Sequence, residues 1–293
     1  MAEKLSVTPS GWIEELVHKI IADPEKNTLQ NQAGDRAFEN PLVGFSSGDD
    51  PLYLDYKDHV GPFHWTPLEI FRLSFPEIKA HADELTVISW ILPHIEATKR
   101  DNRRETQYPA QRWARGKNYG EQVNVQLRKY LVDVLQQKGV AAVAPTLASQ
   151  FSRKMSDKYG FASTWSERHA AYASGLGTFG LSEGLITPRG KAMRAGSVIA
   201  RTRIAPTPRA YSDHRAYCLF HTRGICGKCI QRCPADAISE SGHDKAACRR
   251  YLHETTAGHI KSQYKFDGKS CGLCQTAVPC ESKIPVPADV DAD

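Results

Sequence analysis

Hydrophobic residues in the first two thirds of the chain switch between helical and strand-like spacing. Residues 11–22 place apolar side chains every three or four positions, which predicts an amphipathic helix that ends at Asp23-Pro24. Residues 86–92 form a short, almost continuous apolar run with β-branched members, typical of a buried strand. Residues 119–138 return to helical spacing, and Gly139 supplies the C′ residue.

Four further segments complete the expected fold of this part of the chain. Residues 140–144 read as a second short strand, and residues 166–174 as another helix. Residues 197–200 can close the sheet, and residues 203–208 have the prolines of a linker. Because strands alternate with helices, we expect a sheet domain of the α+β class, α/β-like in its alternation, over residues 1–205.

Two polar stretches interrupt this pattern. Residues 24–66 are rich in Asn, Gly, Asp and Pro, which predicts an extended surface excursion or a cover, and helical spacing resumes at residues 67–71. Residues 98–104 carry four basic side chains. We interpret this run either as a solvated loop or as a contact for phosphate or carboxylate groups.

The last third of the chain contains all eight cysteines, between Cys218 and Cys280. The run Cys226-Gly-Lys-Cys229-Ile-Gln-Arg-Cys233-Pro234 is followed by Cys271-Gly-Leu-Cys274. Thiolates at these spacings can converge on one metal centre, and in bacterial ferredoxins the cysteine before proline belongs to the second cluster. Eight thiolates are the number that two [4Fe-4S] clusters require. The pattern predicts a two-cluster electron-transfer module over residues 206–284, followed by a frayed tail at 285–293.

Three other roles for the cysteines fit this pattern less well. Buried structural thiols would be scattered more evenly along the chain. Disulfides form in oxidising compartments, and the amino end has neither the apolar run nor the cleavage site of a signal peptide. A zinc site of Cys226, Cys229, Cys271 and Cys274 has the paired spacing that zinc prefers, but it leaves four thiols without a role.

Composition and charge leave the class of substrate open. The 293 residues suffice for one large and one small domain, and 41% hydrophobic with 24% charged residues is typical of soluble globular proteins. No apolar run is long enough to span a bilayer, so we expect a cytoplasmic protein without a membrane partner. The net charge of +5 permits an anionic substrate or nucleic acid without requiring either.

Two segments of the first part could contact a cofactor. Gly175, Gly177 and Gly180 have G-x-G-x-x-G spacing, but they follow a helix rather than a strand, so a tight turn at the helix end explains them better than a ligand contact does. Residues 113–119 place aromatic and basic side chains at the start of a helix, where they can hold a cofactor or pack as core and rim.

Together these segments resemble the epoxyqueuosine reductases and, more distantly, the reductive dehalogenases. The resemblance covers roughly residues 86–284 and is carried by residues 113–119, 167–180, 226–238, 248–255 and 271–275. It implies a nitroreductase-like sheet domain, similar to the cobalamin-processing protein of vertebrates, that holds cobalamin, and a ferredoxin-like module with two [4Fe-4S] clusters that supplies electrons. The implied cobalamin contacts are Arg115, Tyr119, Gly175, Leu176, Gly177, Thr178 and Gly180.

The resemblance also divides the cysteines into two ligand sets. The first set is Cys218, Cys226, Cys229 and Cys280, and the second set is Cys233, Cys248, Cys271 and Cys274. The chain departs from the family pattern at two ligands of the first set. Arg223 stands where the family has a cysteine, so Cys218 is assigned that role, and Cys280 follows Pro279 instead of preceding a proline.

A third departure concerns catalysis. Phe161 occupies the position of the aspartate thought to donate a proton in epoxyqueuosine reductases, and Asp157 lies nearby out of register. Asn118 and Gly120 replace a family aspartate and histidine. The remaining candidate proton donors are Tyr119, Tyr108 and Tyr172, each of which is also a plausible structural tyrosine.

Three functions are compatible with these residues. The first is a cobalamin-dependent reductase that takes single electrons from a ferredoxin or flavodoxin and reduces a small or nucleoside-like substrate. The second is a non-catalytic electron carrier for another corrinoid or metal enzyme, and the third is a cytoplasmic relative of the reductive dehalogenases. A tRNA substrate would need a basic face around residues 98–117 and binding that weakens steeply with salt.

Overall fold

A four-stranded antiparallel sheet forms the centre of the molecule in the computed structural model, which describes residues 8–290. Its strands are β1 (Leu42–Ser47), β2 (Thr86–Pro93), β8 (Met193–Ala200) and β3 (Ala142–Val143), in that spatial order. The two long central strands pair along their whole length, from Thr86 opposite Ala200 to Pro93 opposite Met193. Every residue of β2 is buried, as expected for a strand covered on both faces.

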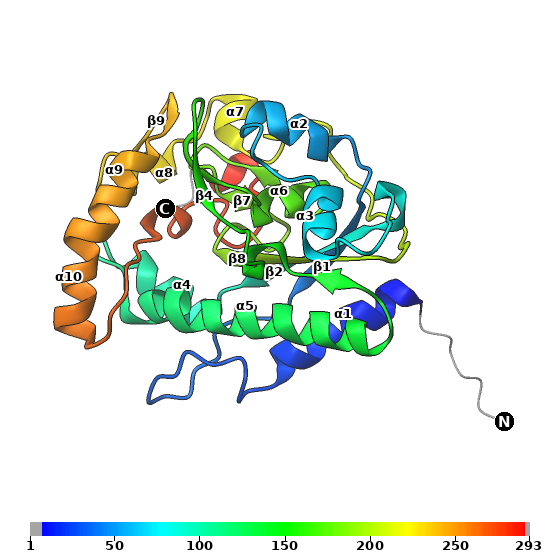
Figure 1. The fold of residues 1–293 in the computed structure, drawn as a ribbon. Coiled ribbons are helices and arrows are strands. Elements are labelled where there is room, and N and C mark those ends of the chain that lie inside the picture. The colour runs from blue at the N-terminus through cyan, green and yellow to red at the C-terminus, as the bar shows by residue number, and fades with distance from the viewer. Residues whose placement is uncertain (1–7, 291–293) are drawn as a thin grey trace.

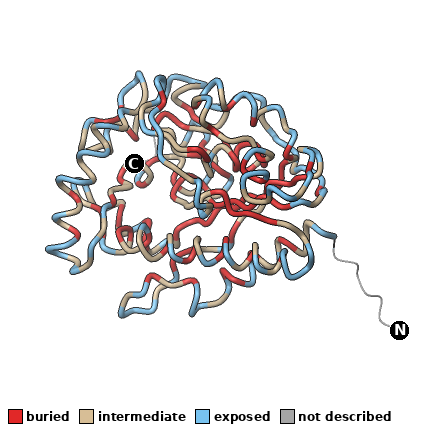
Figure 2. Tube along the Cα trace, in the orientation of Figure 1, coloured by how far each residue is buried: buried red, intermediate tan, exposed pale blue. Residues whose placement is uncertain are grey.

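Helices cover both faces of this sheet, which makes three layers (Figure 1). Because side chains alternate along a strand, Ile88 and Trp90 of β2 face the helices α1 (Pro9–Ala22) and α5 (Gln111–Gln137). Val87 and Ile91 face the opposite way, towards α6 (Glu167–Ala173). Buried residues follow the sheet and the inner sides of these helices (Figure 2).

Shorter elements complete this part of the chain. They are α2 (Leu52–His59), α3 (Pro67–Ser74), η1 (Ala82–Glu84), α4 (Glu96–Arg103), η2 (Pro145–Leu147), β4 (Arg153–Ser156), β5 (Gly160–Ser163), β6 (Thr178–Phe179) and β7 (Leu185–Ile186). Strands β4 and β5 form an antiparallel hairpin, and β6 pairs with β7.

The cysteine-containing part is built from short helical segments and one two-stranded ribbon. Its elements are α7 (Leu219–Arg223), α8 (Lys228–Gln231), β9 (Ile238–Ser239), β10 (Gly242–His243), α9 (Lys245–Arg250), η3 (Tyr251–Thr256), α10 (Ala257–His259), η4 (Ile260–Tyr264), η5 (Leu273–Gln275) and η6 (Pro287–Asp289). The segments from α9 to η4 form one continuous helical column in which η3 and η4 are π-helical (Figure 1). Such turns are uncommon and frequently occur at functional sites.

The structure confirms the mixed helix and strand class and several predicted elements. The helix at 11–22, the strand at 86–92 and the helix at 166–174 are present, and the helix predicted at 119–138 begins earlier, at Gln111. Gly139 has the positive φ of a C′ residue, as expected.

Three expectations were wrong. Residues 24–66 contain the edge strand β1 and helix α2, whose apolar residues are too few and too dispersed to show a period. Residues 197–200 lie in a central strand, between β2 and β3, so they do not close the sheet. Residues 98–104 lie mostly in α4, and the ammonium of Lys99 in this run is buried between two glutamates, so the run is not a solvated loop.

The two parts of the chain are joined by buried polar contacts. Arg103 of α4 forms a bidentate ion pair with Glu281, and Asn102 donates to Thr276 Oγ1 at 3.0 Å. Glu281 is only 5% exposed, so this pairing is largely protected from solvent. The division at residues 205/206 and 284/285 stays a prediction. Within residues 8–290 no helix is both long enough and apolar enough to cross a bilayer.

Two buried histidines make stability depend on pH. Burial lowers the pKa of His64 to about 4 and that of His94 to about 3. Between pH 6.5 and 4 the unfolded chain therefore binds protons that the native histidines do not. We expect the free energy of unfolding to fall over this range by about 1.4 kcal/mol per pH unit for each histidine. Urea unfolding at several pH values measures it, and a stability that stays constant from pH 6.5 to 4 would contradict this account.

Candidate metal and cofactor sites

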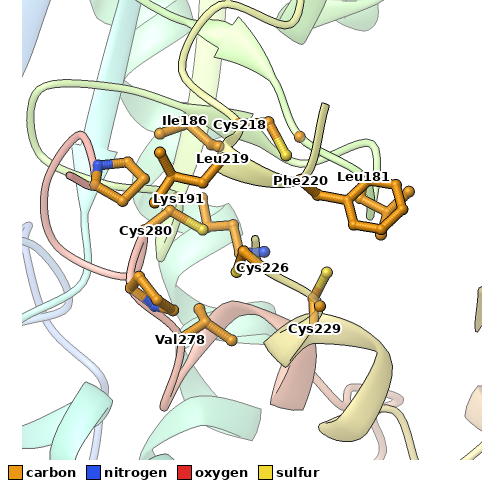
Figure 3. Close-up of a pocket in the computed structure, with 14 residues that line it drawn as sticks. Leu181, Ile186, Lys191, Cys218, Leu219, Phe220, Cys226, Cys229, Val278 and Cys280 are labelled. Atoms are coloured by element: carbon orange, nitrogen blue, oxygen red, sulfur yellow. The ribbon is translucent and has the colours of Figure 1, made fainter. Parts of the chain in front are cut away.

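The four cysteines of the first set line one cavity. Cys218, Cys226, Cys229 and Cys280 come from three separate segments, and their side chains project towards a common space (Figure 3). The walls between them are mostly apolar. The sheet domain contributes Gly180, Leu181 and Ile186, and the cysteine-containing part contributes Leu219, Phe220 and Val278. The structure therefore places together four thiols that are up to 62 positions apart in the sequence.

Backbone contacts fix the position of Cys280 in this cavity. The backbone N–H of Lys191 donates to the carbonyl of Cys280 at 2.9 Å, and that of Ala192 donates to Glu281 at 3.1 Å. Gly190 has a φ of +76°, and a Cβ at this position would lie 2.0 Å from the carbonyl oxygen of Glu281. The turn before β8 therefore packs directly against the backbone of residues 280–282, and only glycine fits at position 190.

Lys191 places a positive charge beside these thiols. Its side chain is 3% exposed, and its ammonium donates to Ser182 Oγ at 3.2 Å. Burial alone would lower the pKa of Lys191, but the neighbouring thiols, Cys280 foremost, outweigh burial and raise it. Burial raises the pKa of the Cys229 and Cys280 thiols, and Lys191 acts in the opposite direction on both.

The four cysteines of the second set also influence one another. Burial raises the pKa of Cys271 to about 11, and the thiols of Cys248 and Cys233 act in the same direction. Burial likewise raises the pKa of Cys274 to about 12, with Cys271 and Cys248 among the thiols that contribute. Cys233 Sγ accepts a hydrogen bond from Ala237 at 3.3 Å. Cys229 of the first set also raises the pKa of Cys274, so these interactions do not separate the two sets, and the division that the resemblance implied stays a prediction.

The spacing of the thiols differs from that of a single-ion site. Among residues 8–290, no group of three or more His, Cys, Asp or Glu side chains is close enough to hold one metal ion. The structure therefore does not bring together the four thiols of the zinc alternative. In a [4Fe-4S] cluster each thiolate binds a different iron, so its four ligands stand further apart than those of one zinc ion.

The loop between Cys271 and Cys274 requires glycine at position 272. Gly272 has a φ of +71°, and a Cβ there would lie 2.0 Å from the indole of Trp113. We expect Gly272→Ala to displace this loop and to lose the iron of the second set, about four of eight irons per chain. Iron analysis after anaerobic reconstitution measures the loss.

Gly224→Ala is the matched control, because Gly224 has a similar φ of +67° with no atom within 4 Å of a Cβ. This control should cost about 1–2 kcal/mol of stability and leave the iron content unchanged. Equal iron content in both variants would show that the Trp113 contact does not position the second set.

The predicted cofactor segment 113–119 packs against the chain just before Cys271. The guanidinium of Arg115 lies 5.2 Å from the ring centres of both Tyr119 and Phe266. Asn118 donates to the carbonyl of Asp267 at 2.6 Å. This segment therefore borders the loop that leads into the second set.

A cleft of about 490 Å³ opens beside this loop, between η3–α10 and residues 267–269. Lys269 and His253 meet on its wall, with 3.1 Å between Nζ and Nε2. Outside the cleft, Arg194 donates to the carbonyl of Lys117 in α5 at 3.0 Å. The positive charge of Arg194, followed by burial, lowers the pKa of Lys117 to about 8, and Lys269 contributes in the same direction. The cleft itself is lined by Lys261 and Lys269, and Lys261 is paired with Asp267 at 3.1 Å.

The glycine run from 175 to 180 forms a turn and a strand. Gly175 has a φ of +77° after α6, and a Cβ there would lie 3.0 Å from the carbonyl oxygen of Pro208. A Cβ on Gly177 would lie 2.2 Å from the carbonyl oxygen of Ile186. The chain's own backbone makes these close approaches. Leu176 and Thr178 are buried, and Gly180 lines the first-set cavity, so contacts of this run with cobalamin stay a prediction.

The three candidate tyrosines fall into two aromatic groups. Tyr108 stacks on His259 at 3.9 Å, and this group continues through Tyr264 and Phe266 to Tyr119. Tyr172 belongs to a different group, where it stacks on Tyr211 at 5.1 Å.

Phe161 lies on β5 and is 39% exposed. The guanidinium of Arg249 lies over its ring at 4.8 Å. The side chain at this position therefore packs against a cation and carries no proton to donate.

Comparisons with solved structures show which known proteins have a similar fold. The catabolic reductive dehalogenase NpRdhA, in complex with 3-bromo-4-hydroxybenzoic acid, superposes with a TM-score of 0.53 and 12% identity. The match covers 96% of this chain and 39% of that one. The chain shares the fold of this reductive dehalogenase. The resemblance inferred from sequence is confirmed at the level of the fold.

Epoxyqueuosine reductases align over a larger share of their own length. The enzyme from Bacillus subtilis has a TM-score of 0.46 and 17% identity, covering 96% of this chain and 70% of that one. The enzyme from Streptococcus thermophilus has a TM-score of 0.48 and 18% identity, covering 96% and 68%. No protein-family model matches the chain, and no curated protein matches it significantly.

Sequence reasoning missed two charged groups that the structure buries. Lys191 follows a glycine in a polar turn, and nothing in its neighbourhood signals a site. Glu167 accepts hydrogen bonds from Thr146 and Arg128, each at 3.1 Å, and from Ser197. Burial raises the pKa of Glu167, and the charge of Arg128 acts against this. The partners of both groups are distant in sequence, so no local pattern reveals them.

Proposed function

We propose that the chain is an iron–sulfur reductase whose two cysteine sets each hold one [4Fe-4S] cluster. The observation that supports this most strongly is the convergence of the first set on one cavity. Cys218 and Cys280 join Cys226 and Cys229 there, although neither belongs to the Cys-x-x-Cys motif. Four thiols and one ammonium on an otherwise apolar wall suit a negatively charged cluster.

The second set suits a cluster of the same kind. Its thiols influence one another, and Arg232 beside them donates to the carbonyls of Leu273 at 3.3 Å and Thr276 at 3.1 Å. These bonds tie the first motif to the 271–276 loop. Besides burial, which raises the pKa of Cys274, the charge of Lys191 lowers this pKa and the thiol of Cys229 raises it. Two clusters held in this way would be neighbours, as a ferredoxin-like module requires.

The cleft beside the second set is the proposed site of a corrinoid. A related dehalogenase structure is described as suggesting a mechanism for B12-dependent dehalogenation. A cobalamin carries a phosphate and many amide groups, and Lys261 and Lys269 line the cleft with N–H donors. Arg115 and Tyr119, predicted from the resemblance, stand on the segment that borders it. When bound, the corrinoid supplies a strongly reducing metal centre, and the chain supplies orientation and protons.

The proton would come from the aromatic group at this cleft. Tyr119 and Tyr108 belong to the group that includes Phe266, directly before cleft residue 267. Tyr172 lies in the other group, with Tyr211 and Tyr217 next to Cys218, so we favour Tyr119 and Tyr108 over it. Both phenols are half-buried, and a phenol can act as a general acid once a bound substrate excludes water.

A small or nucleoside-like substrate agrees best with the charge distribution. One epoxyqueuosine reductase was solved with a tRNA stem loop. In this chain, however, Lys99, Arg103 and Arg112 of the expected basic face are paired with acidic side chains. These pairs leave little free charge for a nucleic-acid backbone. A ferredoxin or flavodoxin would supply single electrons.

Anaerobic reconstitution with iron, sulfide and hydroxocobalamin, followed by gel filtration, tests this function. Cobalt that elutes with the protein in equal amount, together with iron, supports the reductase. Iron without cobalt would favour the alternative, a non-catalytic electron carrier for another enzyme. Uptake of zinc without iron would rule out both.

A further inference from the structure

Lys191 differs from the other positive charges near the cysteines in how it is held. Its ammonium is buried at the first-set cavity, beside the side chains of Cys280 and Cys226 (Figure 3). This ammonium donates to a neutral hydroxyl, that of Ser182, and interacts with the thiol of Cys280 rather than with a carboxylate. By contrast, Arg232 beside the second set donates to three backbone carbonyls.

The acidic side chain closest in sequence to the cavity is already paired elsewhere. Glu281 follows Cys280 directly, but its carboxylate is held by Arg103 and by the backbone N–H of Ala277. The charge of Lys191 is therefore directed at the thiols and at whatever they bind. A buried charge is weakly screened by solvent, so its effect on a neighbouring group is larger than that of a surface lysine.

We propose that Lys191 is the fixed counter-charge of the cluster in the first set and raises the reduction potential of that cluster. The proposal rests on the cluster assignment made above. Reduction transfers one electron from an external donor to the cluster and makes its net charge more negative by one. A nearby positive charge stabilises the reduced form more than the oxidised form, because the attraction grows with the charge. Lys191 thus favours entry of an electron at the first set.

A redox titration followed by electron paramagnetic resonance tests this proposal. Lys191→Met keeps the length of the side chain and removes its charge. We expect the midpoint potential of one cluster to fall by at least about 59 mV, a tenfold change in a one-electron equilibrium, with a smaller change for the other cluster. If Lys191→Met does not take up iron, Lys191→Gln removes the charge while keeping a donor for Ser182.

Two control variants separate charge from packing. Lys283 lies three positions after Cys280, but its side chain is 59% exposed and paired with Asp289, so Lys283→Met should leave both potentials nearly unchanged. Lys191→Arg keeps the charge and should stay close to the parent protein. A shift in Lys191→Met or Lys191→Gln no larger than that in Lys283→Met, or an equal shift in Lys191→Arg, would overturn the proposal.

The result is independent of whether the chain is an enzyme. Iron content is measured first, and a chain without iron would refute the cluster assignment itself. If both clusters assemble and their midpoint potentials do not change when the charge at position 191 is removed, only the role of Lys191 is refuted.

Discussion

Cys218→Ser is expected to lower the iron content of the reconstituted chain from about eight to about four atoms, because one of two [4Fe-4S] clusters loses a ligand. The expectation follows from the first-set cavity, which Cys218 lines together with Cys226, Cys229 and Cys280. The backbone around Cys218 is well fixed, since its carbonyl accepts from Thr222 N at the start of α7. Iron and sulfide analysis of anaerobically reconstituted protein provides the measurement.

Arg223→Ser is the matched control for this prediction. Arg223 is exposed at the end of α7 and occupies the position where the family pattern has a cysteine. Its replacement should leave about eight irons, since we assign the role of the family ligand to Cys218. Full iron content in Cys218→Ser, or a loss in Arg223→Ser, would contradict the assignment of Cys218.

Glu167→Ala is expected to destabilise the folded chain by about 2–3 kcal/mol, because it removes one of the two carboxylates that pair with the buried guanidinium of Arg128, the other being Glu121. Arg128 is 3% exposed, and its Nη2 lies 3.0 Å from a carboxylate oxygen of Glu167. The same carboxylate accepts from Ser197, whose hydroxyl also accepts from Trp165 Nε1 at 3.0 Å. Urea unfolding of the parent and the variant at pH 7 measures the difference.

Asp83→Ala provides a comparison at the surface. Asp83 pairs with Arg203 at 2.8 Å, but both side chains are more than half exposed. Solvent and salt screen this pair, so its removal should change stability little. If the two variants lose equal stability, the contacts of Glu167 with Arg128 and Ser197 do not hold α5, α6 and β8 together as we infer.

Periodic burial explains which parts of the fold were predictable. The strand at 86–92 and the helices at 11–22 and 119–138 have one apolar pattern each, because each is covered by the core along its whole length. Strand β1 was missed, since it lies at an edge and includes Gly44, Ser46 and Ser47. The π-helical turns of η3 and η4 follow from tertiary packing and leave no mark in a local pattern.

The candidate site was predictable to the extent that its chemistry depends on residue type. Cysteine is rare and its spacing is informative, so two clusters could be proposed before any geometry, while the division into two sets came from the family resemblance. The walls of the first-set cavity were not predictable, because Gly180, Leu181 and Lys191 reach it from the sheet domain. The glycine run illustrates the opposite case, since glycines needed for close backbone packing have the same spacing as glycines that meet a ligand.

The iron content of the anaerobically reconstituted parent chain, with its Mössbauer spectrum, tests the central claim most directly. Two clusters predict about eight irons per chain, all in the [4Fe-4S] form. About four irons, or zinc in place of iron, would contradict the assignment of two complete cysteine sets.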